Sequence, residues 1–179
     1  MPRIIYRHDS VNRFIVSAIG EPGNREFFLQ VSSNQGLNTI AVEKEQVRAL
    51  SEQLNLLISE LRRSGSITKA QSSVSAKFDD DPLEIPIESD FQLGVANIAW
   101  MNGVIQLTFQ AISSEDEVLL DDLDDGPDLV IASIPIEIAK GFSVRADRIL
   151  SQGRGACPFC SLPMNISGHL CPRANGYRR

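Results

Sequence analysis

Residues 91–112 read FQLGVANIAWMNGVIQLTFQAI, and this stretch decides the fold class of the chain. Asn102-Gly103 lies between two largely apolar runs, and an Asn-Gly pair in that position is the strongest short-range signal for a two-residue β-hairpin turn. Residues 104–112 alternate between apolar and polar side chains, which is the period of a strand. In residues 91–100 the apolar phase changes near Ala96-Asn97, so we predict a β-bulge there. The stretch therefore predicts an antiparallel hairpin.

A third strand and a helix are expected directly after this hairpin. Residues 129–134 form an apolar run with two β-branched isoleucines and a valine, typical of a buried strand. Pro135 suits the first turn of a helix. Residues 136–151 carry apolar side chains at helical spacing, and the stripe consists of Ile138, Ala139, Phe142, Ala146, Ile149 and Leu150. Glycines at positions 153 and 155 are typical of a helix end.

The first half of the chain repeats this order. Residues 13–19 and 25–32 are predicted strands on either side of the turn formed by residues 20–24, and residues 37–42 are predicted as a third strand. A helix is predicted over residues 43–63, where one stripe collects Val47, Leu50, Leu54, Leu57, Ile58 and Leu61.

The predicted fold class is therefore α+β, with two β-β-β-α units at residues 12–63 and 90–152. A linker rich in Ser, Gly and Asp, residues 64–89, connects them. We expect the units to form one antiparallel sheet covered on one face by two helices. This body, residues 1–152, is followed by a C-terminal tail, residues 153–179, which we predict to be a separate zinc hook.

Composition and net charge indicate the compartment in which the protein acts and the classes of partner it can bind. The chain has 179 residues, of which 42% are hydrophobic and 22% charged, as in soluble globular proteins. No apolar run is long enough for a membrane helix, and the first residues lack the core of a signal peptide, so we expect a cytoplasmic protein without a membrane partner. The net charge is −6, but residues 154–179 contain four arginines and no acid. The remaining −10 on the body would repel nucleic acid.

The chemistry-bearing residues are concentrated in the tail. All three cysteines of the chain and one of its two histidines lie within fifteen residues: Cys157, Cys160, His169 and Cys171. Three thiolates and an imidazole form the ligand set of a closed, four-coordinate structural zinc site. A closed site leaves no position for a substrate or an activated water. We therefore predict one structural Zn²⁺ with these four ligands.

Two other interpretations of the cysteines remain open. Cys157-Pro-Phe-Cys160 resembles the active sequence of glutaredoxin-like proteins, but that motif opens a helix early in the fold, and a redox pair would leave His169 and Cys171 without a role. Three unrelated buried thiols are the other alternative.

Several further motifs carry functional or structural expectations. Beside the metal ligands, Arg173, Tyr177, Arg178 and Arg179 are the candidate partner contacts, because arginine and tyrosine are enriched in binding hot spots. Residues 115–128 are strongly acidic but lack the spacing of a calcium loop, so we expect a solvated loop. His8 is expected to be a satisfied or exposed histidine.

The chain also resembles a known family. The resemblance rests on the turn Gly20-Glu-Pro-Gly-Asn-Arg25 with the strand after it and on the ending Cys-Pro-Phe-Cys…Gly-His-Leu-Cys-Pro-Arg-Ala-Asn-Gly-Tyr-Arg-Arg. Both are similar to an uncharacterised actinobacterial family, domain of unknown function 3090. The resemblance implies a cytosolic actinobacterial protein with a zinc-ribbon-like tail, and it implies no reaction.

Three functions from different classes follow. The leading hypothesis is a non-catalytic binding or adaptor protein whose zinc site orders the arginine-rich C-terminus for contact with another protein. The first alternative is an enzyme whose small-molecule substrate, phosphorylated ones included, binds between the two β-β-β-α units near the turn formed by residues 21–25. The second is nucleic-acid binding through the zinc hook. No catalytic residue can be assigned, and the oligomeric state is not predicted.

Overall fold

The predicted hairpin is present in the computed structural model, in which β5 (Phe91–Met101) turns at Asn102-Gly103 into β6 (Val104–Ala111). Both turn residues have positive φ, 51° and 81°, as a two-residue hairpin turn requires. The bulge lies between Leu93 and Val95, not at Ala96-Asn97, so that part of the prediction was wrong. The structure describes residues 3–113, 125–153, 155–162, 164 and 169–173.

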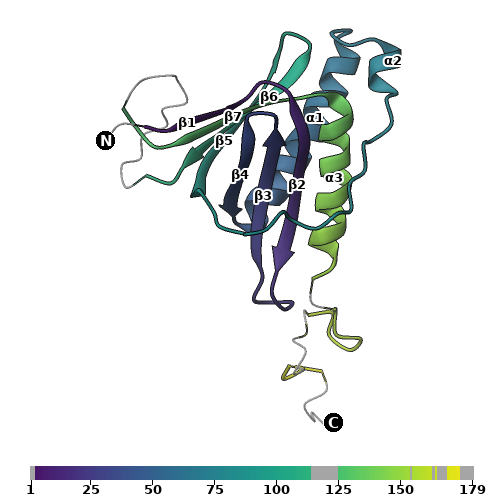
Figure 1. Ribbon diagram of the computed structural model, residues 1–179. Coiled ribbons are helices and arrows are strands. Elements are labelled where there is room, and N and C mark those ends of the chain that lie inside the picture. The colour runs from purple at the N-terminus through teal and green to yellow at the C-terminus, as the bar shows by residue number, and fades with distance from the viewer. Residues whose placement is uncertain (1–2, 114–124, 154, 163, 165–168, 174–179) are drawn as a thin grey trace.

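A single seven-stranded sheet is formed, in the order β1-β7-β6-β5-β4-β3-β2 (Figure 1). Its strands form two three-stranded antiparallel meanders and one added edge strand, β1. The sheet is larger than two β-β-β-α units, and its β1–β7 and β4–β5 pairs are parallel, so the prediction of an antiparallel sheet was only partly right. The remaining strands are β1 (Ile5–His8), β2 (Val11–Ile19), β3 (Glu26–Ser33), β4 (Gly36–Val42) and β7 (Leu129–Ile134).

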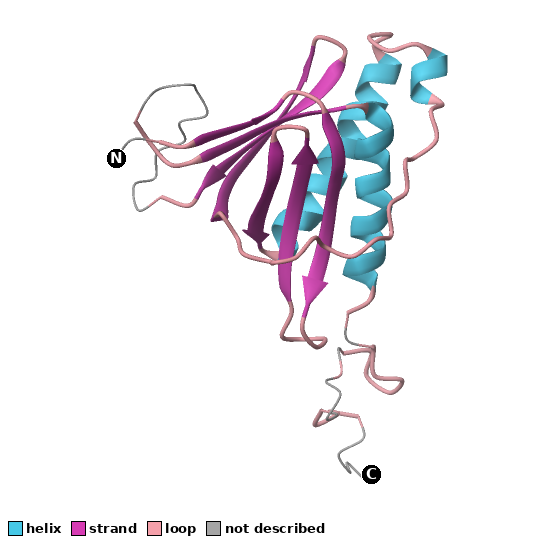
Figure 2. Ribbon diagram, viewed as in Figure 1, coloured by secondary structure: helices cyan, strands magenta, loops and turns pink. Residues whose placement is uncertain are grey.

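Two long helices pack against each other and cover one face of the sheet (Figure 2). They are α1 (Lys44–Arg63) and α3 (Ile136–Ser151), close to the predicted positions. Phe142 of α3 stacks on Phe14 of β2 with ring centroids 4.3 Å apart, and Phe14 lies 6.0 Å from Phe109 of β6. This contact joins the two halves of the chain in one hydrophobic core.

The predicted linker, residues 64–89, is docked onto the body. It contains a short helix, α2 (Lys69–Ser72), which was not predicted, then follows α3 and crosses β2 and β3 on the face opposite the helices (Figure 1). Asp79 accepts from Arg13 Nε at 2.6 Å and from Arg13 Nη2 at 2.9 Å. The side-chain amide of Gln30 exchanges two hydrogen bonds with the backbone of Glu84, at 2.8 and 2.9 Å. The linker therefore shields the outer face of β2 and β3.

Candidate metal centre

The tail begins where α3 ends at Ser151. The Cys157 N–H donates to the Leu162 carbonyl and the Ser161 N–H donates to the Cys157 carbonyl, both at 2.8 Å. Ser161 has a positive φ of 61°, and the Phe159 N–H points at the Cys157 sulfur from 3.4 Å. The chain therefore folds into a tight turn around the Cys157 sulfur, an arrangement that prepares a thiolate to bind a cation.

All four predicted ligands are brought together. One ligand atom from each of Cys157, Cys160, His169 and Cys171 lies within 4.8 Å of the others. The sulfurs of Cys157 and Cys171 are 3.8 Å apart, and Cys160 Sγ is 3.3 Å from His169 Nε2. The cysteines are free thiols in this arrangement.

These distances match the edges of a zinc tetrahedron. With Zn–S distances of about 2.3 Å, two sulfurs in a tetrahedron are about 3.8 Å apart, and a sulfur and an imidazole nitrogen are about 3.5 Å apart. A disulfide would need a separation of about 2.05 Å. The four side chains are thus spaced to share one ion.

Burial and charge also favour a cation at this position. Cys157 and Cys171 are only 4% and 7% exposed. Burial alone would raise the pKa of the Cys157 thiol, but the backbone amides of Cys160 and Phe159 hold that pKa below 9.0. The pKa of Cys160 is raised, first by burial and then by the sulfurs of Cys171 and Cys157. Ionisation of Cys157 is thus favoured by its neighbours, whereas ionisation of Cys160 beside it is disfavoured, and a bound divalent cation would favour the thiolate form of both.

His169 meets the cluster through Nε2. Its other ring nitrogen, Nδ1, is buried and has no hydrogen-bond partner among the residues that the structure describes. Zinc-bound histidines usually donate this second N–H to a carbonyl or carboxylate.

The predicted partner contacts are only partly described. Arg173 is exposed and its Nη1 donates to the Phe159 carbonyl at 3.2 Å, which ties the end of the described tail to the first turn. Tyr177, Arg178 and Arg179 lie outside the described residues. Phe159 and Leu170, one from each ligand pair, are 64% and 85% exposed. The described tail thus presents apolar side chains to solvent beside a cationic one, a combination that the sequence analysis did not single out.

The second histidine has a structural role. His8 is buried, with Nδ1 2.6 Å from the Ser33 hydroxyl and Nε2 2.8 Å from Asn38 Oδ1. Asn38 in turn donates to Asp90. Both ring nitrogens are satisfied, as expected from the sequence, and they connect β1 to β3 and β4. Most of the acidic segment 115–128 lies outside the described residues.

The turn near residues 20–25 adjoins a hollow of about 200 Å³. Two cationic residues, Arg25 and Lys44, contribute to its lining, and the other lining residues are Pro22, Gly23, Phe27, Ile149, Leu150 and Gly153. This lining combines the two cations with apolar side chains and contains no carboxylate.

The fold and the cluster define a class: a mixed α+β protein with a seven-stranded sheet and a Cys₃His group suited to a metal ion near its C-terminus. Residues 6–171 match the family described as protein of unknown function (DUF3090), and the chain belongs to this family. No curated protein and no solved structure matches the chain. Within the described residues, none of the helices combines the length and the apolar character needed to span a membrane.

Proposed function

We propose that this protein is a non-catalytic binding protein whose Cys₃His group holds one structural Zn²⁺. The observation that carries the proposal is the closed ligand set, in which four protein atoms from Cys157, Cys160, His169 and Cys171 lie within 4.8 Å of one another. Four protein ligands fill the tetrahedron, so a zinc ion here would stabilise the tail and would not activate water.

The zinc ion would fix the shape of a segment that the body supports only weakly. Among the described residues, the hydrogen bonds of residues 155–173 stay within the tail. The tail projects beyond the end of α3, away from the sheet (Figure 1). Without a metal, its few hydrogen bonds would not offset the conformational entropy of about 1–2 kcal/mol per ordered residue. Zinc binding thus creates the surface that presents Phe159, Leu170 and Arg173.

The partner we propose is another protein with an acidic and partly apolar surface. The four arginines of residues 154–179 and the absence of any acid there supply the charge. Phe159 and Leu170 supply apolar area at the two turns that the metal would hold. The acidic body disfavours nucleic acid as a partner, since several phosphate contacts are usually needed for affinity. The protein is proposed to act in the cytoplasm, where these thiols stay reduced.

The test of the zinc site is elemental analysis of untagged protein purified without chelator. We expect one zinc per chain in the wild type and none in Cys157→Ser, while the matched variant Ser161→Ala retains the metal. Cobalt substitution should give the absorption of a tetrahedral thiolate site. A metal-free wild type whose Cys157 and Cys160 oxidise reversibly would reject the zinc site in favour of a redox pair.

The test of the binding role uses the C-terminal arginines. Replacing Arg178 and Arg179 with alanine should weaken capture of a partner protein from lysate, with zinc content and melting temperature unchanged. The control replaces Arg62 and Arg63, at the end of α1, with alanine. It removes the same charge at positions far from the tail in the sequence. Equal capture by both double variants would exclude the tail as the contact surface.

A further inference from the structure

One edge of β5 is open along most of the strand. β5 pairs with β6 from Leu93 to Met101, but its pairing with β4 covers only Phe91 and Gln92. The reason is that β4 ends at Val42 and the chain turns into α1, while β5 continues to Met101. Among the residues that the structure describes, no strand takes the place of β4 beyond Gln92.

The hairpin register shows which backbone groups face this open edge. Met101 and Val104 flank the two-residue turn and form a hydrogen-bonded pair. Because hydrogen-bonded and non-hydrogen-bonded pairs alternate in an antiparallel ladder, the N–H and C=O groups of Ala96, Ile98 and Trp100 point away from β6. These three residues therefore present a row of donors and acceptors to an incoming strand.

The other long edge of the sheet, along β2, is covered by side chains from the linker and α3, in contrast to the open edge of β5. On β2, Lys77 of the linker donates to the Asn12 carbonyl at 3.3 Å. Arg145 of α3 donates from Nε to the Val16 carbonyl at 2.7 Å. Proteins usually cover or block the edge strands of their sheets, because an exposed edge invites pairing with other chains. On β5, the described part of the chain offers one such contact, from the Gln46 side chain to the Leu93 carbonyl at 3.1 Å.

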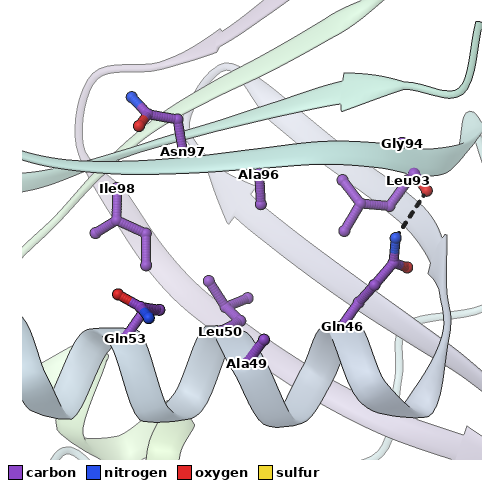
Figure 3. Close-up of a pocket in the computed structure, with 9 residues that line it drawn as sticks. All are labelled: Gln46, Ala49, Leu50, Gln53, Leu93, Gly94, Ala96, Asn97 and Ile98. Carbon is purple, nitrogen blue, oxygen red and sulfur yellow. Dashed lines mark hydrogen bonds between the residues drawn. The ribbon is translucent and has the colours of Figure 1, made fainter. Parts of the chain in front are cut away.

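A groove of about 370 Å³ runs beside the open edge, between β5 and α1 (Figure 3). Small residues on both walls, Ala49 and Ala96, leave the space, and Leu50 and Ile98 point into it (Figure 3). The nine lining residues include no charged side chain: Gln46, Ala49, Leu50, Gln53, Leu93, Gly94, Ala96, Asn97 and Ile98. No local sequence pattern indicates this groove, because residues on its two walls, such as Gln46 and Leu93, are 47 positions apart in the chain.

We propose that this groove binds an extended, uncharged peptide segment of a partner protein, which adds as a strand to β5 in the place that β4 vacates. The occupant must have an extended main chain, because only another strand can pair with all of the free N–H and C=O groups along this edge of β5. The neutral lining excludes charged side chains at the inserted residues, because a buried unpaired charge is costly. The aliphatic floor favours a residue such as valine or leucine there. Gln53 supplies an amide on the α1 wall (Figure 3).

This inference is independent of the metal-binding tail. A second copy of the chain is the competing occupant, because two open β5 edges could pair with each other. The groove favours a peptide, because only a narrow segment fits between β5 and α1. The β5 strand of a second copy would bring its own α1 with it, and that helix would not fit into the groove.

The experiment uses the full chain and a display library of random twelve-residue peptides. Enriched peptides are synthesised and titrated while the fluorescence of Trp100, the single tryptophan of the chain, is followed. We expect uncharged cores with aliphatic residues at alternate positions, a shift in Trp100 emission, and slower amide hydrogen exchange at Ala96, Ile98 and Trp100. Failure to enrich any peptide, or protection that appears elsewhere, overturns the proposal.

Two variants test the edge and the groove separately. Ala96→Pro removes an N–H that faces the open edge, a position where strands tolerate proline. Affinity should fall about two- to tenfold, as expected for the loss of one main-chain hydrogen bond. Ala49→Phe fills the groove without changing β5 or adding a second tryptophan, and it should abolish binding. Asn55→Phe, on the exposed surface of α1, should bind as the wild type does. Undiminished affinity in both Ala96→Pro and the Ala49 variant, or a wild-type dimer that Ala96→Pro dissociates, overturns the peptide proposal.

Discussion

Gly141 lies in the middle of α3 at the point where the linker passes over the helix. A methyl group added at Gly141 would lie 2.0 Å from the Lys77 carbonyl oxygen and 2.8 Å from the Lys77 carbonyl carbon. Both atoms belong to backbone, which cannot rotate away as a side chain can. In Gly141→Ala the linker must therefore move by about 1 Å or more to restore van der Waals distance.

The expected cost combines three terms. Overpacking of this kind costs about 1–3 kcal/mol. The displacement also strains or breaks the 2.8 Å hydrogen bond from the Lys77 N–H to the Glu137 carbonyl, worth about 1 kcal/mol. In the opposite direction, alanine in place of glycine inside a helix raises the free energy of unfolding by about 1 kcal/mol. The free energy of unfolding should therefore fall by about 1–3 kcal/mol, and at about 2–4 °C per kcal/mol the melting temperature should fall with it.

Urea unfolding and amide hydrogen exchange test this prediction. The Lys77 amide should lose protection in Gly141→Ala, while amides of β6 in the core should keep theirs. Val144→Ala, at an exposed position of the same helix, is the control and should change stability by no more than about 0.5 kcal/mol. If Gly141→Ala were more stable than the wild type, helix propensity alone would govern the site and the docking of the linker on α3 would be refuted.

Four further results are expected. Asp79→Asn should cost about 1.5–3 kcal/mol, because Arg13 loses a charged partner. The hydrogen bond from Arg13 holds the pKa of Asp79 below its ordinary 3.8. The difference in the free energy of unfolding between wild type and Asp79→Asn should therefore be full at neutral pH and should shrink as the pH falls below 3.8 towards the folded-state pKa. Urea unfolding curves that differ equally at pH 7 and pH 2.5 would contradict this prediction. Phe142→Ala should lower the free energy of unfolding by about 3–5 kcal/mol by opening a cavity in the core, and a loss below 1 kcal/mol would mean that the site collapses. Gly103→Ala should cost about 1–2 kcal/mol in the same assay, because its φ is 81°, with Asn102→Gly as a tolerated control. Chelation of the proposed zinc should abolish amide protection in the tail while calorimetry shows the body melting almost as before; joint unfolding of both parts would show that the tail supports the core.

Local sequence patterns were sufficient for the parts of this protein whose partners are close along the chain. The Asn102-Gly103 hairpin was predicted because the turn and both of its strands lie within 22 residues. The helix over residues 136–151 was predicted at its observed bounds, because its apolar period is uninterrupted and glycines follow it. The grouping of the metal ligands was predicted for the same reason, since all four lie within fifteen residues. In each case a short chain segment limits the arrangements that are sterically available.

Only the tertiary structure decided the features that depend on distant pairing. β1 has four residues and pairs with β7, about 124 positions away, so no local period could identify it. The bulge at Gly94 is placed by the backbone at Ala111 and Ile112, which leaves no room for a side chain there. The docking of the linker depends on Arg13 and Gln30, and their partners are more than 50 residues away.

The open edge of β5 is the clearest case of this division. The amino-acid pattern was enough to predict a strand over residues 91–100, because the apolar pattern and the turn are local. Whether that strand has one neighbour or two was decided by where β4 ends and α1 begins, at Val42 and Lys44. A periodic pattern records which face of a strand is buried and carries no information about which edge is paired, since edge pairing is made by backbone groups that every residue shares.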